Sequence, residues 1–270
     1  MLEQKIIDEI EKLPSMPETL YKLQSLKNDE TRNVEKLTKI VETDPSIVAN
    51  LLKTAKSPLY GFTQKIEKVS VVIGLFGVDT VINIVLYDMV KKNFDFNLKP
   101  YGITETEYSE SIKRRMFLVN KWISKIDLDI SKDILFSSIF YDLGKLIASQ
   151  VLLKSGKVDE FKLYIQEGES IEVTEKKILG TFSEEITIKM LEKMGLEEEN
   201  YKYIKYINSP NLAPNGCKKE AILLYIIKKV IGYKIDLDKN KLTKIEKFIE
   251  EKNLKVEVFN EVLEKILENK

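Results

Sequence analysis

The sequence predicts an all-α protein, and three observations lead to this prediction. Ser or Thr stands three residues before Glu, the pattern of a helix capping box, at Ser15 with Glu18, Thr104 with Glu107, and Thr181 with Glu184. No segment combines Asn-Gly or Asp-Gly turns with the alternating apolar pattern of antiparallel strands. Apolar residues recur at the spacing of one helix face through most of the chain, as at Val34, Leu37, Ile40 and Val41.

The N-terminal part of the chain is expected to form a bundle of short helices. Residues 1–13 carry acids among apolar residues, which indicates an amphipathic helix rather than a signal peptide. Asp44 is expected to cap a helix whose first turn holds Pro45, and this helix should end before Pro58. The apolar run 69–90 is interpreted as two buried helices joined near Gly77, not as a membrane span.

Residues 91–103 lose the helical periodicity and contain Asn, Pro and Gly, so they are the best inter-lobe linker. Two long helices should follow, and their apolar faces are listed as Ile112, Met116, Val119, Trp122 and Ile126, and as Ile134, Leu135, Ile139, Leu143 and Ile147. Further helices are expected at about 158–167, 182–194, 199–208 and 218–231. The predicted division is a first helical lobe at 1–95, a second at 96–235, and C-terminal helices packed on the second at 236–270.

Composition excludes several classes of function. The chain of 270 residues has 43 basic and 43 acidic residues and no histidine. The charge balance gives no net field towards nucleic acid or an anionic membrane. The lack of histidine excludes imidazole bases, Ser-His-Asp and Cys-His nucleophiles, and imidazole metal ligands. A single cysteine, Cys217, excludes an intrachain disulfide and is compatible with a reducing cytoplasm, where we expect the protein to act.

Arginine is rare: the only three are Arg32, Arg114 and Arg115. Bidentate guanidinium clamps on phosphates or carboxylates are therefore nearly unavailable. Tyr201, Tyr203 and Tyr206 alternate with lysines, but they do not form one helical stripe. They are interpreted as core and boundary aromatics rather than as a base-stacking surface.

The N-terminal part contains an ordered set of motifs. The set begins with a Leu-Pro-x-x-Pro segment, continues with an Asp-Pro helix entry and a Ser-x-x-Tyr-Gly turn, and ends in a pair of apolar helices. Its residues are Leu13, Pro14, Pro17, Asp44, Pro45, Ser57, Tyr60, Gly61, Ile66, Val69, Ile73 and Gly77. In this order the set closely resembles the HDOD family, the HD-related output domain of bacterial signalling proteins. Lys56, Gly74 and Phe76 depart from the family pattern.

The second lobe resembles the HD-hydrolase remnant of the same family. Tyr141 stands where HD enzymes keep a histidine, and it is followed by the retained Asp142, Gly144 and Lys145. The resemblance places four other residues where HD enzymes carry metal-binding or nearby motif positions: Glu110, Ser183, Ile207 and Asn208. The implied fold is a degenerate HD-like helical lobe.

Two interpretations of the degenerate site remain open. HD hydrolases hold their metal with several imidazoles and the Asp. In one interpretation, Asp142 and Glu110 supply two carboxylates to a hydrated Mg²⁺. In the other, which we favour, Asp142 satisfies nearby donors beneath its helix and Lys145 is a solvated neighbour. We then expect no metal, no cofactor and no catalytic residue.

The resemblance and the missing histidines together favour a non-enzymatic output or adaptor module that contacts signalling or regulatory proteins in trans. The alternatives are a residual metal-dependent phosphohydrolase or a relic cleft that binds a nucleotide without turnover. For Asp44, Pro45, Ser57, Tyr60 and Gly61 we expect structural duties, with a partner-docking loop at 57–62, anchored by Tyr60, as the alternative.

Overall fold

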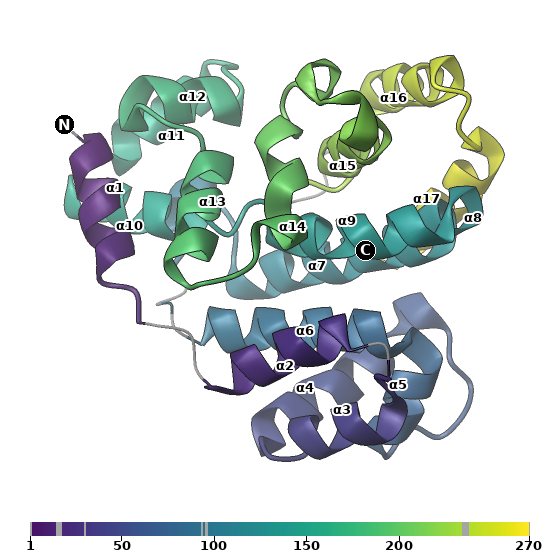
Figure 1. Ribbon diagram of the computed structural model, residues 1–270. Coiled ribbons are helices and arrows are strands. Elements are labelled where there is room, and N and C mark those ends of the chain that lie inside the picture. Colours follow the sequence, from purple (N-terminus) through teal and green to yellow (C-terminus); the bar gives the residue numbers. More distant parts are fainter. Residues whose placement is uncertain are drawn as a thin grey trace.

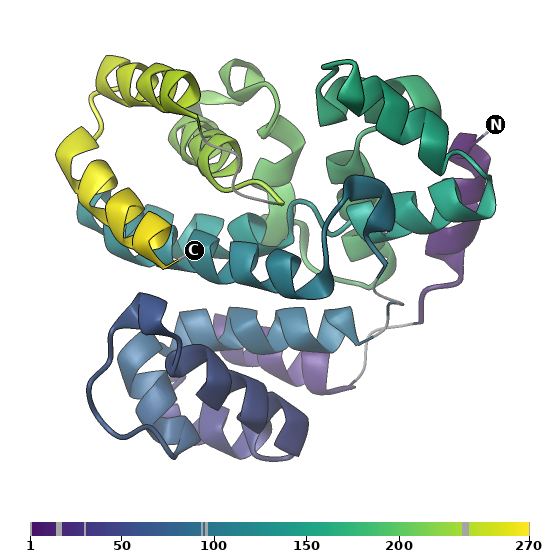
Figure 2. The ribbon, with the colours of Figure 1, turned by 180° about the vertical axis from the view of Figure 1, so that it is seen from behind.

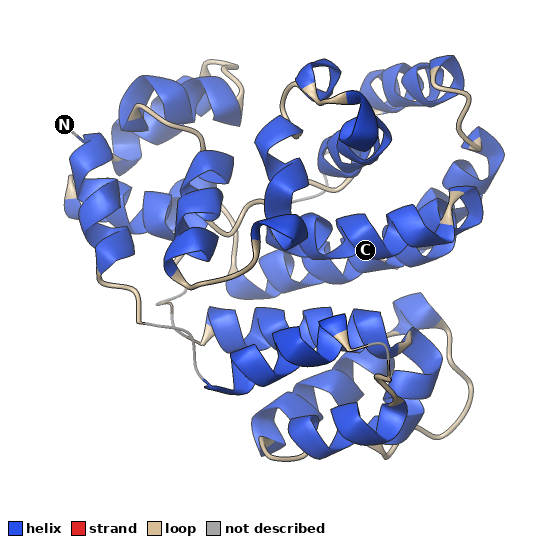
Figure 3. Ribbon diagram, in the orientation of Figure 1, coloured by secondary structure: helices blue, strands red, loops and turns tan. Residues whose placement is uncertain are grey.

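The computed structural model describes residues 2–14, 18–29, 31–92, 94, 97–233 and 238–269. Within these residues the protein is helical and has no strand, which confirms the predicted fold class (Figures 1 and 3). The helices of the first lobe are α2 (Glu18–Asn28), α3 (Val34–Val41), α4 (Pro45–Ala55), the 3₁₀ turn η1 (Pro58–Tyr60), α5 (Val69–Phe76) and α6 (Val78–Lys91).

The second lobe begins with the 3₁₀ turn η2 (Lys99–Tyr101) and one long, composite helix. The composite helix consists of α7 (Glu105–Leu118), the π-helical segment η3 (Val119–Ile123) and α8 (Ser124–Ile126). The next elements of the second lobe are α9 (Leu128–Phe140), α10 (Lys145–Lys154), α11 (Val158–Gln166) and α12 (Ile171–Leu179). The remaining elements are α13 (Ser183–Lys193), α14 (Glu198–Tyr201), η4 (Lys202–Tyr206), η5 (Pro210–Leu212), η6 (Asn215–Cys217), α15 (Lys218–Val230), α16 (Lys239–Glu251) and α17 (Val256–Glu268).

The first lobe is the lower body in Figure 1, where α6 lies along its upper side and faces the second lobe. α3 and α4 pack on α5, and α2 and α4 pack on α6. The apolar periodicity noted in the sequence supplies the core, since Leu37, Val41, Ile47 and Leu51 are all at most 2% exposed. α6 in turn packs on α9 and joins the two lobes.

The predicted break near Gly77 is confirmed. The axes of α5 and α6 meet at 116° across Gly77, whose φ of 84° lies in the region that favours glycine. Among the described helices, none alone has the length and apolar character of a membrane span; the bent pair α5 and α6 together meets that test of length and composition. Most of α6 is buried inside the protein, including the consecutive residues from Thr80 to Tyr87.

The second lobe is organised around α9, which packs on α7, α14 and α15 as well as on α6. α16 packs on α15, and α17 packs on α7 and η3, as Figure 2 shows from behind. The helices α16 and α17 therefore contact α15, α7 and η3. Trp122 is fully buried against Phe259 of α17, with ring centroids 5.0 Å apart.

α1 (Leu2–Glu11) lies elsewhere than predicted. It contacts α10, α13 and α12 of the second lobe, at the left edge of Figure 1. The physical reason is that its apolar face, with Ile6 and Ile10 at 2% and 5% exposure, is buried there rather than in the bundle that follows it along the chain. The remaining boundaries of the predicted division stay a prediction.

Four details of the predicted helices were wrong. The expected continuous face from Ile134 to Ile147 is divided between α9 and α10 by a turn at 141–144, and the segment 199–208 divides into α14 and η4. No helix was expected at α12. Thr181 hydrogen-bonds to Glu185, not to Glu184, because α13 begins one residue later than the capping pattern implied.

Candidate functional site

Asp142, the retained acid of the HD-like motif, is completely buried in the turn between α9 and α10. Both of its carboxylate oxygens accept hydrogen bonds from Arg115 on α7, at 2.9 Å to Oδ1 and 2.5 Å to Oδ2. The Tyr108 hydroxyl donates a third bond, 2.8 Å long, to Oδ1. A bidentate guanidinium and a hydroxyl thus occupy three of the roughly four acceptor positions of the carboxylate.

Arg115 is also completely buried, and it makes further hydrogen bonds besides those to Asp142. Its Nε donates to the carbonyl of Ile231 at 3.1 Å, and its second terminal nitrogen donates to the carbonyl of Gly232 at 2.8 Å. Burial by itself would lower the pKa of Arg115, but the Asp142 carboxylate outweighs burial and raises it. The guanidinium is therefore permanently charged and supplies the positive charge beside Asp142.

Tyr141, which the sequence resemblance placed at the position of a histidine in HD enzymes, also contacts Arg115. Its ring lies 4.3 Å from the guanidinium carbon, and its hydroxyl donates to the Ile231 carbonyl at 2.9 Å. Burial raises the pKa of this phenol well above its ordinary value, so it stays protonated. Tyr141 thus fixes the end of α15 over the turn and offers neither a metal ligand nor a base.

Gly144 allows α13 to approach the turn more closely than any other residue would. A Cβ atom at this position would lie 2.0 Å from the carbonyl oxygen of Ser183 and 2.7 Å from the backbone nitrogen of Thr187. The Gly144 N–H donates instead to the Thr187 hydroxyl at 2.7 Å, and this hydroxyl donates onward to the Tyr141 carbonyl.

Lys145 was predicted to be a solvated neighbour, and this prediction was wrong. Its side chain is 5% exposed, and its ammonium bonds Glu175 of α12 at 2.9 Å and the Ser183 hydroxyl at 2.7 Å. Glu175 is fully buried and also accepts from the Tyr101 hydroxyl and the Ser183 backbone N–H. A buried ammonium is stable only when paired, which the sequence alone could not show because Glu175 lies 30 residues away.

A second buried charge group lies beside the first, at the start of α13. Glu184, 3% exposed, accepts from Lys228 of α15 at 2.6 Å, and Lys228 also pairs with Glu172 at 2.9 Å. Asn208, one of the residues singled out in the sequence, is exposed and joins this group through Lys228 at 2.6 Å and Glu184 at 3.3 Å.

Two of the predicted site positions lie outside this network. Ile207 is 1% exposed and packs in the apolar core. Glu110 faces a different cavity, between the lobes, and pairs with Lys113 at 2.6 Å. Within the described part of the chain, no group of three Asp, Glu, His or Cys side chains could hold a metal ion.

The residues present do not fit the metal of an HD hydrolase. The chain has no imidazole, and its retained carboxylate already binds a guanidinium through both oxygens. A cation placed against Asp142 would meet the fixed positive charge of Arg115 at hydrogen-bond distance, which opposes binding. The arrangement can hold α7, α9 and α15 together, but it presents no open coordination position.

The motif residues of the first lobe have structural contacts. The Asp44 carboxylate caps α4 by accepting from the backbone of Ser46 and Ile47, and it pairs with Lys92 at 2.7 Å. Pro45 occupies the first turn of α4, as predicted. These two residues therefore act at the start of a helix.

The turn at 57–61 lies against the second lobe. Ser57 precedes η1 without a side-chain cap bond, and Gly61 ends η1 with a φ of 61°, as its predicted turn requires. Tyr60 is half-buried, donates to the Lys113 carbonyl at 3.2 Å and packs edge-on against Phe117 of α7. Pro14 is exposed after α1, and Pro17 lies outside the described residues.

Sequence reasoning missed the partners of the motif, above all Arg115, Tyr108, Glu175 and Lys228. A usable signal was present for one of them. Arg115 is one of three arginines in a lysine-rich chain, and a planar guanidinium is the cation best suited to a buried bidentate pair. The sequence analysis took the rarity of arginine to mean that bidentate guanidinium contacts are nearly absent, whereas Arg115 makes such a contact with Asp142.

Comparison with known proteins supports this description of the fold. The family model of the HDOD domain matches residues 13–210. A comparison with curated protein sequences found no match. A virulence factor of Campylobacter jejuni is similar in structure, with a TM-score of 0.62, 24% identity, and coverage of 99% of this chain and 96% of that one.

Two further solved structures share the fold at lower identity. An HDOD domain protein of unknown function from Geobacter sulfurreducens has a TM-score of 0.66 and 13% identity over 98% of this chain and 97% of its own. A protein from Marinobacter aquaeolei, described as a candidate signal transduction protein, has a TM-score of 0.72 and 18% identity. This chain aligns over 97% of its own length with 58% of that protein.

Proposed function

Because the chain belongs to the HDOD domain family, we propose that it is a non-enzymatic output or adaptor module of bacterial signal transduction. It acts in the cytoplasm by contacting signalling or regulatory proteins in trans. The observation that carries the proposal is the bidentate bond between Arg115 and Asp142, because it commits the one retained metal ligand of the HD motif to a structural contact.

The burial of the motif supports the same proposal. A hydrolytic site needs a metal or base that a substrate and a water molecule can reach. Asp142 is 0% exposed, Tyr141 is 1% exposed, and Lys145 is held by Glu175 and Ser183. These side chains connect α7, α10, α12 and α13, so their function is to hold a fixed arrangement of helices whose outer surface partners contact.

The first experiment distinguishes this proposal from a residual phosphohydrolase. The purified protein is analysed for bound metals and assayed with bis(p-nitrophenyl) phosphate in the presence of Mn²⁺ or Mg²⁺. We expect substoichiometric metal and a hydrolysis rate that does not change in Asp142→Asn. Stoichiometric metal together with activity that Asp142→Asn abolishes would overturn the proposal.

The second experiment identifies partners. Proximity labelling in the source cell, with the full chain as bait and the labelling enzyme alone as control, is expected to enrich the same signalling or regulatory proteins in independent repeats. Repeated labelling that enriches no such protein would contradict a role in signal transduction. A nucleotide-binding relic is tested separately, by the shift of Tm in the presence of nucleoside mono-, di- and triphosphates.

A further inference from the structure

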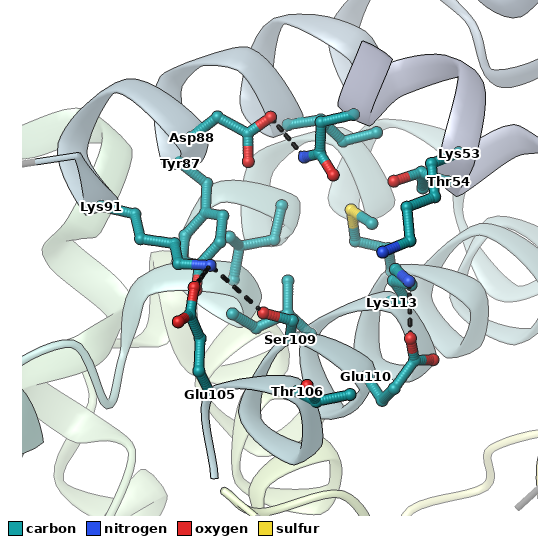
Figure 4. Close-up of a pocket in the computed structure, with 15 residues that line it drawn as sticks. Lys53, Thr54, Tyr87, Asp88, Lys91, Glu105, Thr106, Ser109, Glu110 and Lys113 are labelled. Carbon is teal, nitrogen blue, oxygen red and sulfur yellow. Dashed lines mark hydrogen bonds and ion pairs between the residues drawn. The ribbon is translucent and has the colours of Figure 1, made fainter. Parts of the chain in front are cut away.

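A cavity of about 190 Å³ lies between the two lobes, and Glu110 is the one predicted HD-site position in its lining (Figure 4). Its walls come from α4 and α6 on one side and from α7 and α9 on the other. Apolar side chains, among them Ile84, Ile112 and Met116, contribute to the lining, and several charged groups face the same space. Polar and charged side chains make up most of the lining, so the cavity is suited to a small charged molecule and not to an apolar one.

One polar atom of the cavity wall has no partner within the described residues. The side chain of Tyr87 is 6% exposed, and its hydroxyl makes no hydrogen bond. Burial raises the pKa of this phenol well above its ordinary value, so the hydroxyl remains a donor. Buried polar groups in native proteins are nearly always paired, so this hydroxyl beside the cavity is available as a donor to a molecule that binds there.

The neighbouring Asp88 makes no close ion pair among the described residues, although the charges of Lys91 and Lys92 act on it from a greater distance. Its carboxylate accepts a 2.5 Å hydrogen bond from the neutral amide of Asn50 and makes no ion pair within the described part of the chain. Burial raises the pKa of Asp88, and the hydrogen bond from Asn50 only partly opposes this effect. A ligand ammonium at this position would compensate the partly buried negative charge.

Positive charge lies at the other end of the cavity. Figure 4 shows the side chains of Lys53 and Lys113 extending towards each other there, across the cavity from Tyr87 and Asp88. Lys113 is bound to Glu110 at 2.6 Å, whereas Lys53 is exposed and has no ion pair among the described residues. This end of the cavity is therefore suited to a carboxylate.

We propose that this cavity binds a small zwitterion of the amino-acid class, with its ammonium group at Asp88 and its carboxylate at Lys53 and Lys113. Tyr87 donates its free hydroxyl to the bound molecule. The volume is below the range of drug-sized ligands, which fits a molecule of this size and not a nucleotide. Both lobes contribute to the site, so the ligand would favour one relative position of the lobes.

The experiment measures the Tm of the full chain with each of the common free L-amino acids and with γ-aminobutyrate, followed by calorimetric titration of those that raise it. The matched controls are an alkyl carboxylate and an alkylamine of the same length. We expect at least one zwitterion to raise the Tm in a concentration-dependent way, and neither single-charge control to do so. No shift with any zwitterion, or an equal shift with a control, would overturn the proposal.

Two conservative variants test the position of the bound molecule. Tyr87→Phe removes a buried hydroxyl that has no partner, so it should not lower the Tm of the ligand-free protein, and it should weaken binding by about tenfold. Asp88→Asn should weaken binding at least as much, and the surface variant Lys56→Ala should bind like the natural sequence. Binding that survives both cavity variants unchanged would show that the molecule binds elsewhere and would overturn the proposal. The outcome is independent of whether the protein contacts signalling partners.

Discussion

At the scale of single residues, buried ion pairs hold Asp142 and Lys145, two of the residues singled out in the sequence. Asp142 and Arg115 are both 0% exposed, so folding removes both charges from water. The desolvation cost of each ion is several kcal/mol, and it is offset only while the partner and the additional hydrogen bonds remain in place. The pair is thus strongly stabilising only when it is complete, and loss of one member leaves an uncompensated charge.

The first prediction follows from this asymmetry. Asp142→Ala should lower the free energy of unfolding by about 3–5 kcal/mol, because Arg115 would remain buried without its counter-ion. Urea denaturation followed by circular dichroism measures the effect. The control is Lys39→Ala in the exposed pair with Glu35, which should change stability by less than about 0.5 kcal/mol. Equal effects of the two substitutions would contradict the structural role of Asp142.

The second prediction concerns acid stability. Burial by itself would raise the pKa of Glu172, but Lys228 outweighs it and lowers the pKa to about 2. A carboxyl with a lowered folded-state pKa contributes stability above its unfolded value, and this contribution disappears as the pH falls through the folded value. Glu172→Gln should therefore reduce stability at pH 7 and flatten the loss of stability between pH 4.5, the ordinary pKa of a glutamate, and a pH of about 2. Chemical denaturation across this pH range measures both changes, and parallel curves for the two proteins would contradict the prediction.

At the scale of elements, the turn before α10 and the start of α13 approach each other so closely that a side chain at Gly144 would not fit. Gly144 sits under the Ser183 carbonyl, and the hydrogen bond to Thr187 holds the two helices at this distance. Gly74 of α5 is the opposite case, since nothing lies within 4 Å of the position of its Cβ. Two glycines that look alike in the sequence thus differ in what their missing side chain permits.

The third prediction compares these two glycines. Gly144→Ala should destabilise the protein by about 3 kcal/mol or more, because backbone atoms and not a flexible side chain fill the space. Gly74→Ala should stabilise it by about 0.5–1 kcal/mol, because alanine restricts the unfolded chain and Gly74 lies inside a helix. Thermal unfolding should show a lower Tm for Gly144→Ala and a higher Tm for Gly74→Ala than for the natural sequence. A destabilised Gly74→Ala would mean that α5 has a close neighbour at this position.

Local signals predicted the elements of this fold well, and contacts between distant residues account for what they missed. Some residues determine where a helix begins or breaks within a few positions of themselves, so the sequence shows their roles. They are Asp44 with Pro45, Thr104 with Glu107, and Gly77. Arg115 and Asp142 are 27 residues apart, and only packing brings them together. Lys145 and its partner Glu175 are likewise distant in the sequence, which is why the sequence analysis found the motif but wrongly expected Lys145 to be solvated.

At the scale of the whole molecule, the buried face of α1 belongs to the second lobe. Ile6 and Ile10 pack within the continuous core, and α1 contacts α10 and α13. The ion pairs Lys154–Glu9 and Lys193–Glu11 lie along the same contact. The first helix of the chain therefore stabilises helices that follow it by more than 130 residues.

The fourth prediction tests this long-range contact. Ile6→Ala should cost about 2–5 kcal/mol, because a large buried side chain is removed from a packed core. Hydrogen exchange should accelerate in α10 and α13, while α3 and α5 of the first lobe keep their protection if the lobes unfold separately. The exposed Ile7→Ala is the control and should leave both lobes unchanged. Faster exchange confined to the first lobe would contradict the observed position of α1.

The position of α1 also makes the first lobe an insertion. The second lobe is assembled from the start of the chain and from everything after α6, so the first lobe is nested inside its sequence. The polypeptide crosses between the lobes twice, once after α1 and once after α6. Two crossings restrain relative movement more than a single tether does, and shortening the chain from either end removes parts of the second lobe first. An exchange of the first lobe between relatives would therefore need two junctions, and α1 would have to stay with the recipient.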